Sequence, residues 1–231
     1  RAETLRDDAA PRREKVIVDG GDAELAAMIR RNLEFVYPYA ADCVLPLKTS
    51  VTAEAAAEDG DDYNYLDLEE ETSSERGTAM HKFLEHYRFD GADAESELSR
   101  QLAEGLLSAE DAALLDMRAL KRLLAGDVFG MLGGYALYKE RWFMINVPAA
   151  VIGKEGSGIM LQGIVDLLAV KDGEAIIVDY KYSAKDADSL VRAYRKQLSL
   201  YKYAVESALG LKVKAAYLVS LAEAKALAVS V

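Results

Sequence analysis

Two aspartates and a lysine near the middle of the chain combine reactive residue types with a spacing that can bring them together. Asp166 ends the run Gly-Ile-Val-Asp, and Asp179 follows thirteen residues later in the run Val-Asp-Tyr-Lys, which ends at Lys181. Apolar residues flank the turn signal Asp172-Gly173 between them, and this pattern predicts two strands joined by a tight hairpin. Because side chains alternate along a strand, Asp179 and Lys181 should share one face, and the hairpin should bring Asp166 beside them.

The chemistry that this arrangement predicts is the binding of a hard metal ion beside a water molecule. Unpaired charges at the edge of an apolar sheet are costly, and Mg²⁺ prefers oxygen donors such as the carboxylates of Asp166 and Asp179. Lys181 would orient or help to deprotonate the attacking water and would offset charge in the transition state. The carbonyl of Tyr180 is a further candidate ligand. The alternative interpretation is a structural salt bridge between strand-end acids and Lys181.

An upstream segment offers a nitrogen ligand for the same ion. The run Gly-Thr-Ala-Met-His-Lys-Phe-Leu-Glu begins at Gly77 and predicts a helix over about 78–89, on which His81 and Glu85 lie one turn apart. His81 as a ligand would make Mn²⁺ a good substitute for Mg²⁺. In most proteins a lone helical histidine is an ordinary packed or surface residue, so that interpretation stays open. Glu85 is expected only to orient its neighbours.

Polar residues of a later predicted helix, over about 188–208, follow the candidate site directly. Gln197 and Tyr201 are four residues apart and share a helix face, from which both can hydrogen-bond phosphate oxygens or the carboxylates. An ordinary packing role is the alternative for Tyr201. Glu140, at the head of an earlier predicted strand, is a candidate to contact the metal ligands rather than the metal itself.

Charge is spread unevenly along the chain. The net charge is −11, which is unfavourable for a nucleic-acid partner. Residues 54–75 hold ten acids and no base, whereas residues 181–202 hold six bases and two acids. Arg192, Arg195 and Lys196 of the basic segment are candidate phosphate contacts, with a plain solvated helix face as the alternative for each.

The order of these motifs resembles the PD-(D/E)XK nuclease superfamily, and its RecB-like branch in particular. The resemblance rests on the aspartate, the later Asp-x-Lys and the Gln-x-x-x-Tyr helix, and the segment from Gly77 to Glu85 resembles the helix that supplies the histidine of that family. Tyr37-Pro-Tyr-Ala, together with residues 45–52, resembles the segment leading into the nuclease domain of AddA-type bacterial helicase–nuclease subunits. The resemblance extends over nearly the whole chain.

The resemblance implies an activity and partners. It implies an Mg²⁺- or Mn²⁺-dependent deoxyribonuclease, an exonuclease acting on single-stranded DNA in double-strand-break repair and recombination. It further implies an AddB-like second nuclease subunit and a helicase motor in the same parent chain. The candidate phosphate contacts Arg192, Arg195 and Lys196, taken from the charge pattern, would then bind DNA. ATP would bind only at that motor, because the sequence has no Gly-x-x-x-x-Gly-Lys-[Ser/Thr] phosphate loop.

Two rival functions are weighed against this interpretation. The first is a free-standing exonuclease or a CRISPR-associated Cas4-like nuclease. The second is an inactive nuclease fold that serves as a binding scaffold. Its only support is the negative net charge of the chain. Cys43 is the single cysteine, so the chain cannot build the cysteine-held iron–sulfur cluster that some relatives carry. With no apolar run of membrane length and no secretory leader, the cytoplasm is expected.

The expected fold is α/β, with a PD-(D/E)XK (restriction-endonuclease-like) core in which helices flank a mixed sheet. The expected division is a lead-in segment over 1–53, an acidic flexible linker over 54–76 and a nuclease domain over 77–231. Further predicted elements are a short strand at 15–18, a helix over 22–36, two helices within 93–125, and strands at 140–147, 159–170, 175–182, 215–221 and 225–231.

Overall fold

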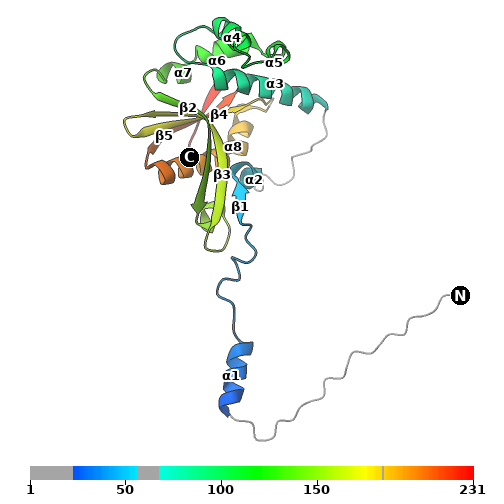
Figure 1. The fold of residues 1–231 in the computed structure, drawn as a ribbon, viewed down its shortest axis with the longest axis vertical. Helices are drawn as coiled ribbons and strands as arrows, with labels where there is room; N and C mark the ends of the chain where they lie inside the picture. Colours follow the sequence, from blue (N-terminus) through cyan, green and yellow to red (C-terminus); the bar gives the residue numbers. More distant parts are fainter. Residues whose placement is uncertain (1–22, 57–67, 184) are drawn as a thin grey trace, which may run out of the picture. The chain divides into compact units, whose positions relative to one another are not determined.

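The computed structural model describes residues 23–56, 68–183 and 185–231, and for residues 68–74 it describes the backbone alone (Figure 1). The chain divides into two compact units, residues 1–40 and 41–231. The described part of the first unit contains helix α1 (Ala23–Leu33), close to the predicted bounds, and its apolar side chains are exposed. The predicted strand at 15–18 lies outside the described residues. No helix in the described ranges is long and apolar enough to cross a membrane.

The second unit is built on a mixed sheet of six strands in the order β1-β3-β4-β5-β6, with β2 pairing with β3. The antiparallel β2–β3 pair is the longest ladder, and β4–β5 and β1–β3 are parallel. The three strands predicted before the helix of about 188–208 and the two strands predicted after it are all present. The strands are β1 (Lys48–Ser50), β2 (Ala136–Val147), β3 (Ile159–Lys171), β4 (Glu174–Lys181), β5 (Lys212–Ser220) and β6 (Lys225–Val229).

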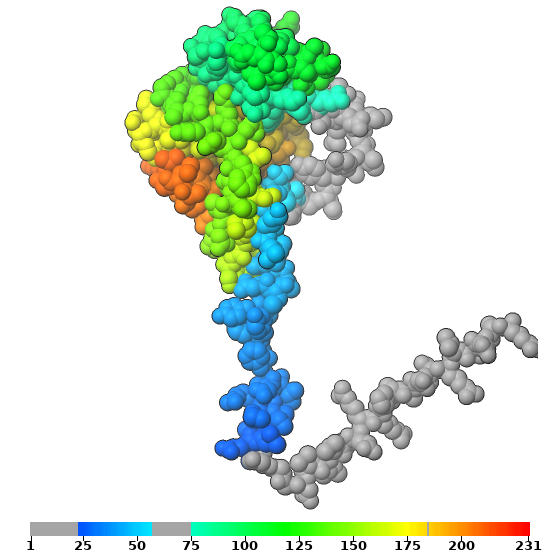
Figure 2. All heavy atoms as spheres, viewed as in Figure 1, coloured from blue at the N-terminus to red at the C-terminus, as the bar shows by residue number. Residues whose placement is uncertain are grey.

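Helices cover both faces of this sheet. One buried cluster joins α3, the helices after it and one face of β3 and β4, while the other joins α2 and α8 to the opposite face. In the space-filling view, α3 to α7 form one continuous mass at the top of this unit (Figure 2). The expected α/β sandwich is thus confirmed. The helices are α2 (Val51–Ala56), α3 (Leu68–His86), α4 (Ala94–Ala103), α5 (Ala109–Leu114), α6 (Met117–Leu124), α7 (Asp127–Met131) and α8 (Ala187–Leu209), with a 3-10 turn at Ala149–Ile152.

The β3–β4 hairpin has the predicted turn. Asp172 and Gly173 both have positive φ, 51° and 79°, which is the combination that a type I′ turn requires. Along β4, Val178 and Tyr180 pack into the cluster of α3 while Ile177 packs into the cluster of α8. The alternation that places Tyr180 opposite to Asp179 is therefore real.

The structure divides the chain differently from the expected lead-in and linker. β1 pairs with residues 160–162 of β3, and Val51 of α2 is fully buried against the sheet. Both elements lie at or before the start of the expected linker, yet they belong to the compact unit of residues 41–231. The reason is that β4 pairs only with residues 167–171 of β3, which leaves the earlier part of β3 free for β1. Helix α3 begins at Leu68 rather than near residue 78, and residues 57–67 of the expected linker lie outside the described range.

The predicted pair of helices in residues 93–125 is replaced by three helices, followed by α7. The side chains of Asp93, Ser108 and Asp116 each accept a hydrogen bond from the backbone three residues later. Such N-caps satisfy amide groups that a helix start leaves unpaired. Three caps therefore start three short helices, where apolar periodicity alone predicts two.

A buried carboxylate ties α4 to the end of α3. Glu97 is fully buried, and its carboxylate accepts hydrogen bonds from Arg88 Nε at 2.9 Å and from Arg100 Nη2 at 2.8 Å. Arg100 also donates to the carbonyl of His86 at 2.7 Å. The Arg100 hydrogen bond, with help from Arg88 and against the effect of burial, lowers the pKa of Glu97 to about 2.

Replacing Glu97 by glutamine should lower the free energy of unfolding by about 2 kcal/mol at pH 7, because two guanidinium groups lose their anion. The pKa of Glu97 is lowered on folding, so this stabilisation is present above its ordinary pKa of about 4.5 and is lost as the pH falls toward about 2. Urea unfolding at several pH values measures the difference. The control is Glu95→Gln on the same helix, an exposed residue paired with Lys121, for which a change below about 0.5 kcal/mol is expected. Equal losses in both variants would contradict the role of Glu97.

Candidate metal centre

Asp166 lies where the partner of β3 changes. β4 is paired with β3 as far as Val178, opposite Leu167, and then diverges. At the next position, the Oδ2 atom of Asp166 accepts a hydrogen bond from the backbone N–H of Tyr180 at 2.7 Å. The carboxylate thus replaces the backbone acceptor that β3 no longer offers. Burial raises the pKa of Asp166, against the lowering effects of the Lys181 ammonium and this hydrogen bond.

His81 reaches the same point from α3. Its Nε2 atom is 2.9 Å from the carbonyl oxygen of Tyr180, and its ring packs edge-to-face on the Tyr180 ring at 5.5 Å between centroids. A carbonyl can only accept, so Nε2 carries the proton and donates it. In the neutral ring the lone pair then resides on Nδ1, which lies 3.9 Å from Asp166 Oδ2. Burial, with the nearby Lys181 ammonium, lowers the pKa of His81 and favours this neutral form.

Glu140 joins these two residues through an unusual backbone conformation. It has φ of 46° within β2, a left-handed conformation that costs a non-glycine residue roughly 1–2 kcal/mol. As a result, two successive side chains turn toward α3. Lys139 Nζ donates to the carbonyls of Glu85 at 2.7 Å and Tyr87 at 2.6 Å, and the Glu140 carboxylate lies beside His81.

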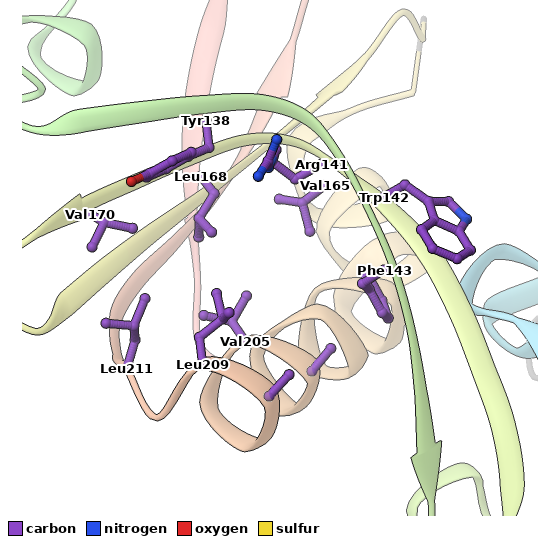
Figure 3. A pocket seen from close by; sticks show the side chains of 12 residues that line it. Tyr138, Arg141, Trp142, Phe143, Val165, Leu168, Val170, Val205, Leu209 and Leu211 are labelled. Atoms are coloured by element: carbon purple, nitrogen blue, oxygen red, sulfur yellow. The ribbon is translucent and has the colours of Figure 1, made fainter.

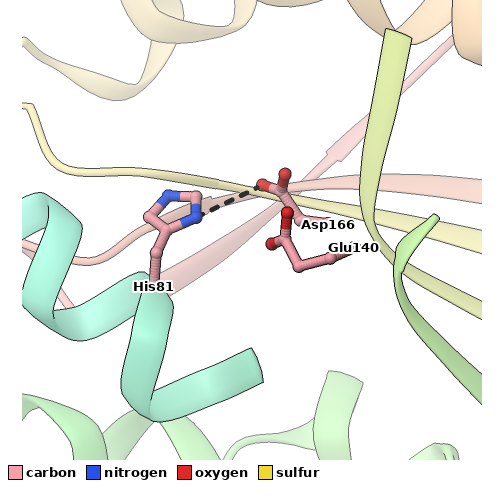
Figure 4. A group of neighbouring side chains, drawn as sticks. All are labelled: His81, Glu140 and Asp166. Atoms are coloured by element: carbon pink, nitrogen blue, oxygen red, sulfur yellow. Dashed lines mark ion pairs between the residues drawn. The ribbon is translucent and has the colours of Figure 1, made fainter. Parts of the chain in front are cut away.

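One ligand atom each from His81, Glu140 and Asp166 lies within 4.8 Å of the others (Figure 4). Burial, together with the carboxylates of Asp166 and Glu85, raises the pKa of Glu140 to about 7. Burial of a carboxyl group close to other carboxylates produces such a rise. Backbone strain and electrostatic repulsion are both concentrated here, which is typical of functional sites.

Asp179 and Lys181 form a buried ion pair next to this group. Lys181 Nζ lies 2.6 Å from Asp179 Oδ2, and the side chain of Asp179 is almost completely buried. Burial and the Asp166 carboxylate raise the pKa of Asp179 to about 6, against the effect of Lys181. Burial lowers the pKa of Lys181, but the carboxylates of Asp179 and Asp166 outweigh it and the net shift is upward. Lys181 is therefore a cation in the folded protein.

Residues of α8, which covers the sheet face opposite to α3, contact the Asp179–Lys181 pair. The amide Nε2 of Gln197 donates to Asp179 Oδ1 at 2.9 Å and lies 2.9 Å from the hydroxyl of Tyr201. Lys181 Nζ also lies 5.0 Å from the centroid of the Tyr194 ring, a distance suited to a cation–π interaction. The predicted shared face of Gln197 and Tyr201 is thus present, with both residues buried.

The donor set suits a divalent cation. The buried Oδ2 atom of Asp179 has the Lys181 ammonium as its neighbour, at 2.6 Å. Carboxylate oxygens are the donors that Mg²⁺ prefers, and an imidazole nitrogen is compatible with Mn²⁺. A metal-binding histidine usually donates its other N–H to a backbone carbonyl or carboxylate, as His81 does toward Tyr180. The residues present therefore fit a bound Mg²⁺ or Mn²⁺ ion.

The remaining predicted site residues are more peripheral. Glu85 is half-buried, and its charge contributes to the raised pKa of Glu140, one of the three candidate metal ligands that lie together. Arg192 and Arg195 are exposed on α8. Lys196 is half-buried and lies close enough to Glu54 of α2 to help lower the pKa of that carboxyl.

From the sequence, Glu140 was expected to contact the metal ligands and not the metal itself. Its carboxylate instead belongs to the same group of donor atoms as His81 and Asp166. The one available signal was a glutamate at the head of an otherwise apolar strand. The left-handed φ that turns it inward leaves no mark in the sequence, because such conformations are usually marked by glycine or asparagine.

Comparison with known proteins identifies the family of the chain. The family model of the PD-(D/E)XK nuclease superfamily matches residues 55–229. The chain is 32% identical over 218 residues to an ATP-dependent helicase/nuclease subunit of Carboxydothermus hydrogenoformans, covering 85% of this chain and 19% of the relative. It is 28% identical over 225 residues to the protein of the same name in Acetivibrio thermocellus, with 85% and 18% covered.

The chain therefore spans about a fifth of the length of these curated relatives. A solved structure, the crystal structure of SSO0001, aligns with 89% of this chain and 75% of its own at a TM-score of 0.35 and 12% identity. A superposition as loose as this one supports no conclusion.

Proposed function

This chain belongs to the PD-(D/E)XK nuclease superfamily, and we propose that it hydrolyses phosphodiester bonds of single-stranded DNA with Mg²⁺ or Mn²⁺ as cofactor. The observation that carries this proposal is the convergence of His81, Glu140 and Asp166 on one point, beside the buried pair of Asp179 and Lys181. Three potential anions, one lysine and a neutral imidazole together are costly to bury. They become useful when a divalent cation and a phosphate enter.

We assign the metal to His81 Nδ1 and to the carboxylates of Asp166 and Asp179, as expected from the sequence, and add the carboxylate of Glu140. The Tyr180 carbonyl remains a candidate ligand and, through its hydrogen bond, holds the His81 ring in the required tautomer. When bound, the ion would polarise the phosphate and lower the pKa of a coordinated water.

Residues of the chain then position the attacking water and the metal ligands, and they neutralise charge on the phosphate. Lys181, a buried ammonium, orients the attacking water and offsets charge that develops on the phosphate oxygens. Gln197 fixes Asp179 through Oδ1 and thereby leaves Oδ2 toward the site. Tyr201 holds the Gln197 amide in turn. Both α8 residues thus act on the geometry of Asp179, besides any contact that they make with phosphate.

DNA would follow the basic part of α8. The exposed Arg192 and Arg195 are assigned to phosphate contacts, and Lys196 contributes from its half-buried position. With a net charge of −11, the isolated chain should bind DNA weakly and with strong dependence on salt, since its affinity depends on releasing counterions at a few phosphates.

The name of the relatives suggests the larger protein and the complex in which this chain would act. An ATP-dependent helicase/nuclease subunit would carry a motor in the same polypeptide, with ATP bound there, and the nuclease site would receive a single strand from it. We further propose an AddB-like partner subunit, exonucleolytic cutting, a role in double-strand-break repair and recombination, and a cytoplasmic location. A motor that feeds the strand raises its local concentration at the site, which compensates for weak intrinsic binding.

The test is cleavage of an end-labelled single-stranded oligonucleotide by the purified chain, with Mg²⁺, Mn²⁺, Ca²⁺ or EDTA. Cleavage is expected with Mg²⁺ and Mn²⁺ and none with EDTA. His81→Gln should weaken Mn²⁺ binding by at least about tenfold in calorimetric titration, because a neutral nitrogen ligand is lost.

The matched control is His86→Gln at the other histidine of the chain, five residues later, whose side chain has no assigned role. It should bind Mn²⁺ as the wild type does. Metal-independent cleavage, or equal Mn²⁺ affinity of both histidine variants, would contradict the assigned centre. Absence of cleavage together with intact Mn²⁺ binding would favour the scaffold alternative.

A further inference from the structure

One face of the β2–β3 ribbon beyond the metal centre is apolar, and no other element of the described part of residues 41–231 covers it. Trp142, Met144 and Ile164 are 61%, 47% and 44% exposed. Trp142 pairs directly with Ile164 across the two strands. The alternate residue Phe143 packs into the cluster of α8, so the three exposed side chains lie on the opposite face of the ribbon.

This face adjoins the candidate metal centre. Trp142 is two residues from Glu140 on β2, and its cross-strand partner Ile164 is two residues from Asp166 on β3. Two residues of an extended strand span about 7 Å. If the phosphate of one nucleotide lies at the candidate metal centre, the base of the next nucleotide can therefore reach the Trp142 ring.

The charge of the face also suits a phosphate chain. Gln162 lies opposite Met144, Asn146 lies opposite Met160, and Lys48 of β1 follows on the far side of β3. These positions carry no carboxylate in the described strands, although the chain as a whole has a net charge of −11. A strand of nucleic acid laid along this face would meet apolar and neutral groups and one lysine.

We propose that Trp142, flanked by Met144 and Ile164, is a stacking platform for the unpaired bases of the single-stranded nucleic acid next to the cleaved phosphate. The proposal rests on the proposed function, because the metal centre defines where the phosphate lies. Proteins that bind single strands without sequence preference combine such aromatic faces with a route for the backbone. A docked polypeptide is the less favoured occupant, since it would cover the ribbon immediately beside the metal centre.

The other face of the same ribbon supplies a matched comparison. There a groove of about 400 Å³ lies between β2, β3 and α8, lined by residues that include Tyr138, Leu168 and Leu209. Trp142 also lines this groove, but in Figure 3 its ring stands at the rim and points away from the side chains of Tyr138 and Phe143. Tyr138 is thus a half-exposed aromatic residue of the same strand that the proposal leaves out.

The experiment uses the single tryptophan of the chain as its own probe. Intrinsic fluorescence is followed during titration with oligothymidylate in EDTA, so that no cleavage occurs, and at low salt. Stacking on Trp142 should quench the emission, and an abasic oligomer with the same number of phosphates should not. Trp142→Leu should bind labelled oligothymidylate about tenfold more weakly in fluorescence anisotropy, while Trp142→Phe should recover most of the affinity.

Tyr138→Leu serves as the control and should bind as the wild type does. No quenching up to about 1 mM oligonucleotide, equal quenching by the abasic oligomer, or wild-type affinity of Trp142→Leu would overturn the proposal and leave the face for a protein partner. Equal losses in Trp142→Leu and Tyr138→Leu would also overturn it, since strand stability would then be the cause. Cleavage without quenching refutes only the platform, and quenching by a chain that never cleaves refutes only the nuclease assignment.

Discussion

Asp166→Asn should abolish Mn²⁺ binding at the candidate centre and reduce cleavage of single-stranded DNA by about 10³-fold or more. The substitution keeps the size of the side chain and an oxygen that can still accept from the N–H of Tyr180, now bonded at 2.7 Å. It removes the charge that a divalent cation needs. The fold should survive, because this change also removes the Asp166 charge, which adds to the effect of burial in raising the pKa values of Glu140 and Asp179.

The control for this variant lies in the same hairpin. Asp172→Asn makes the identical chemical change at an exposed turn residue with φ of 51°, a conformation that asparagine tolerates. Melting temperature, calorimetric Mn²⁺ titration and gel-based cleavage should all match the wild type there. If Asp166→Asn retained both Mn²⁺ binding and cleavage, the carboxylate would be a structural acceptor for β4 and not a metal ligand.

The sequence predicted well those parts of the site that depend on local geometry. The turn signal at Asp172-Gly173 sets the hairpin, and strand alternation then determines the faces of Asp179 and Tyr180. Helical spacing likewise places Gln197 and Tyr201 on one face, where a hydrogen bond of 2.9 Å links their side chains. Periodicity and turn chemistry are local properties, so one sequence is enough to predict them.

Features that depend on distant segments escaped prediction. Thr49 of β1 pairs with Leu161, more than a hundred residues later, and no local pattern identifies that partner. The same pairing draws Val51 into the core next to a residue range that has the composition of an acidic linker. Glu140 belongs to this class, because its inward orientation depends on a backbone φ angle of 46°, and no local sequence pattern marks that angle.

Lys181→Ala should separate chemistry from metal binding. Cleavage should fall by about 10²–10⁴-fold, the usual contribution of a positioned acid–base group. Mn²⁺ affinity should be equal to or higher than that of the wild type, because an ammonium 2.6 Å from Asp179 Oδ2 competes with the cation for that oxygen. The metal-free protein should melt at a lower temperature, since Asp166 and Asp179 lose the cation that offsets their burial.

Added Mn²⁺ should therefore raise the melting temperature of Lys181→Ala more than that of the wild type, because the ion takes over the neutralising role of the amine. Lys185→Ala is the matched control, an exposed lysine four residues further along, and it should change neither melting nor cleavage appreciably. A variant that loses Mn²⁺ binding along with cleavage would show that Lys181 organises the carboxylates, and that it does not act on water or phosphate. Full cleavage by Lys181→Ala would remove the lysine from the mechanism altogether, and the chemical step would then rest on the metal ligands.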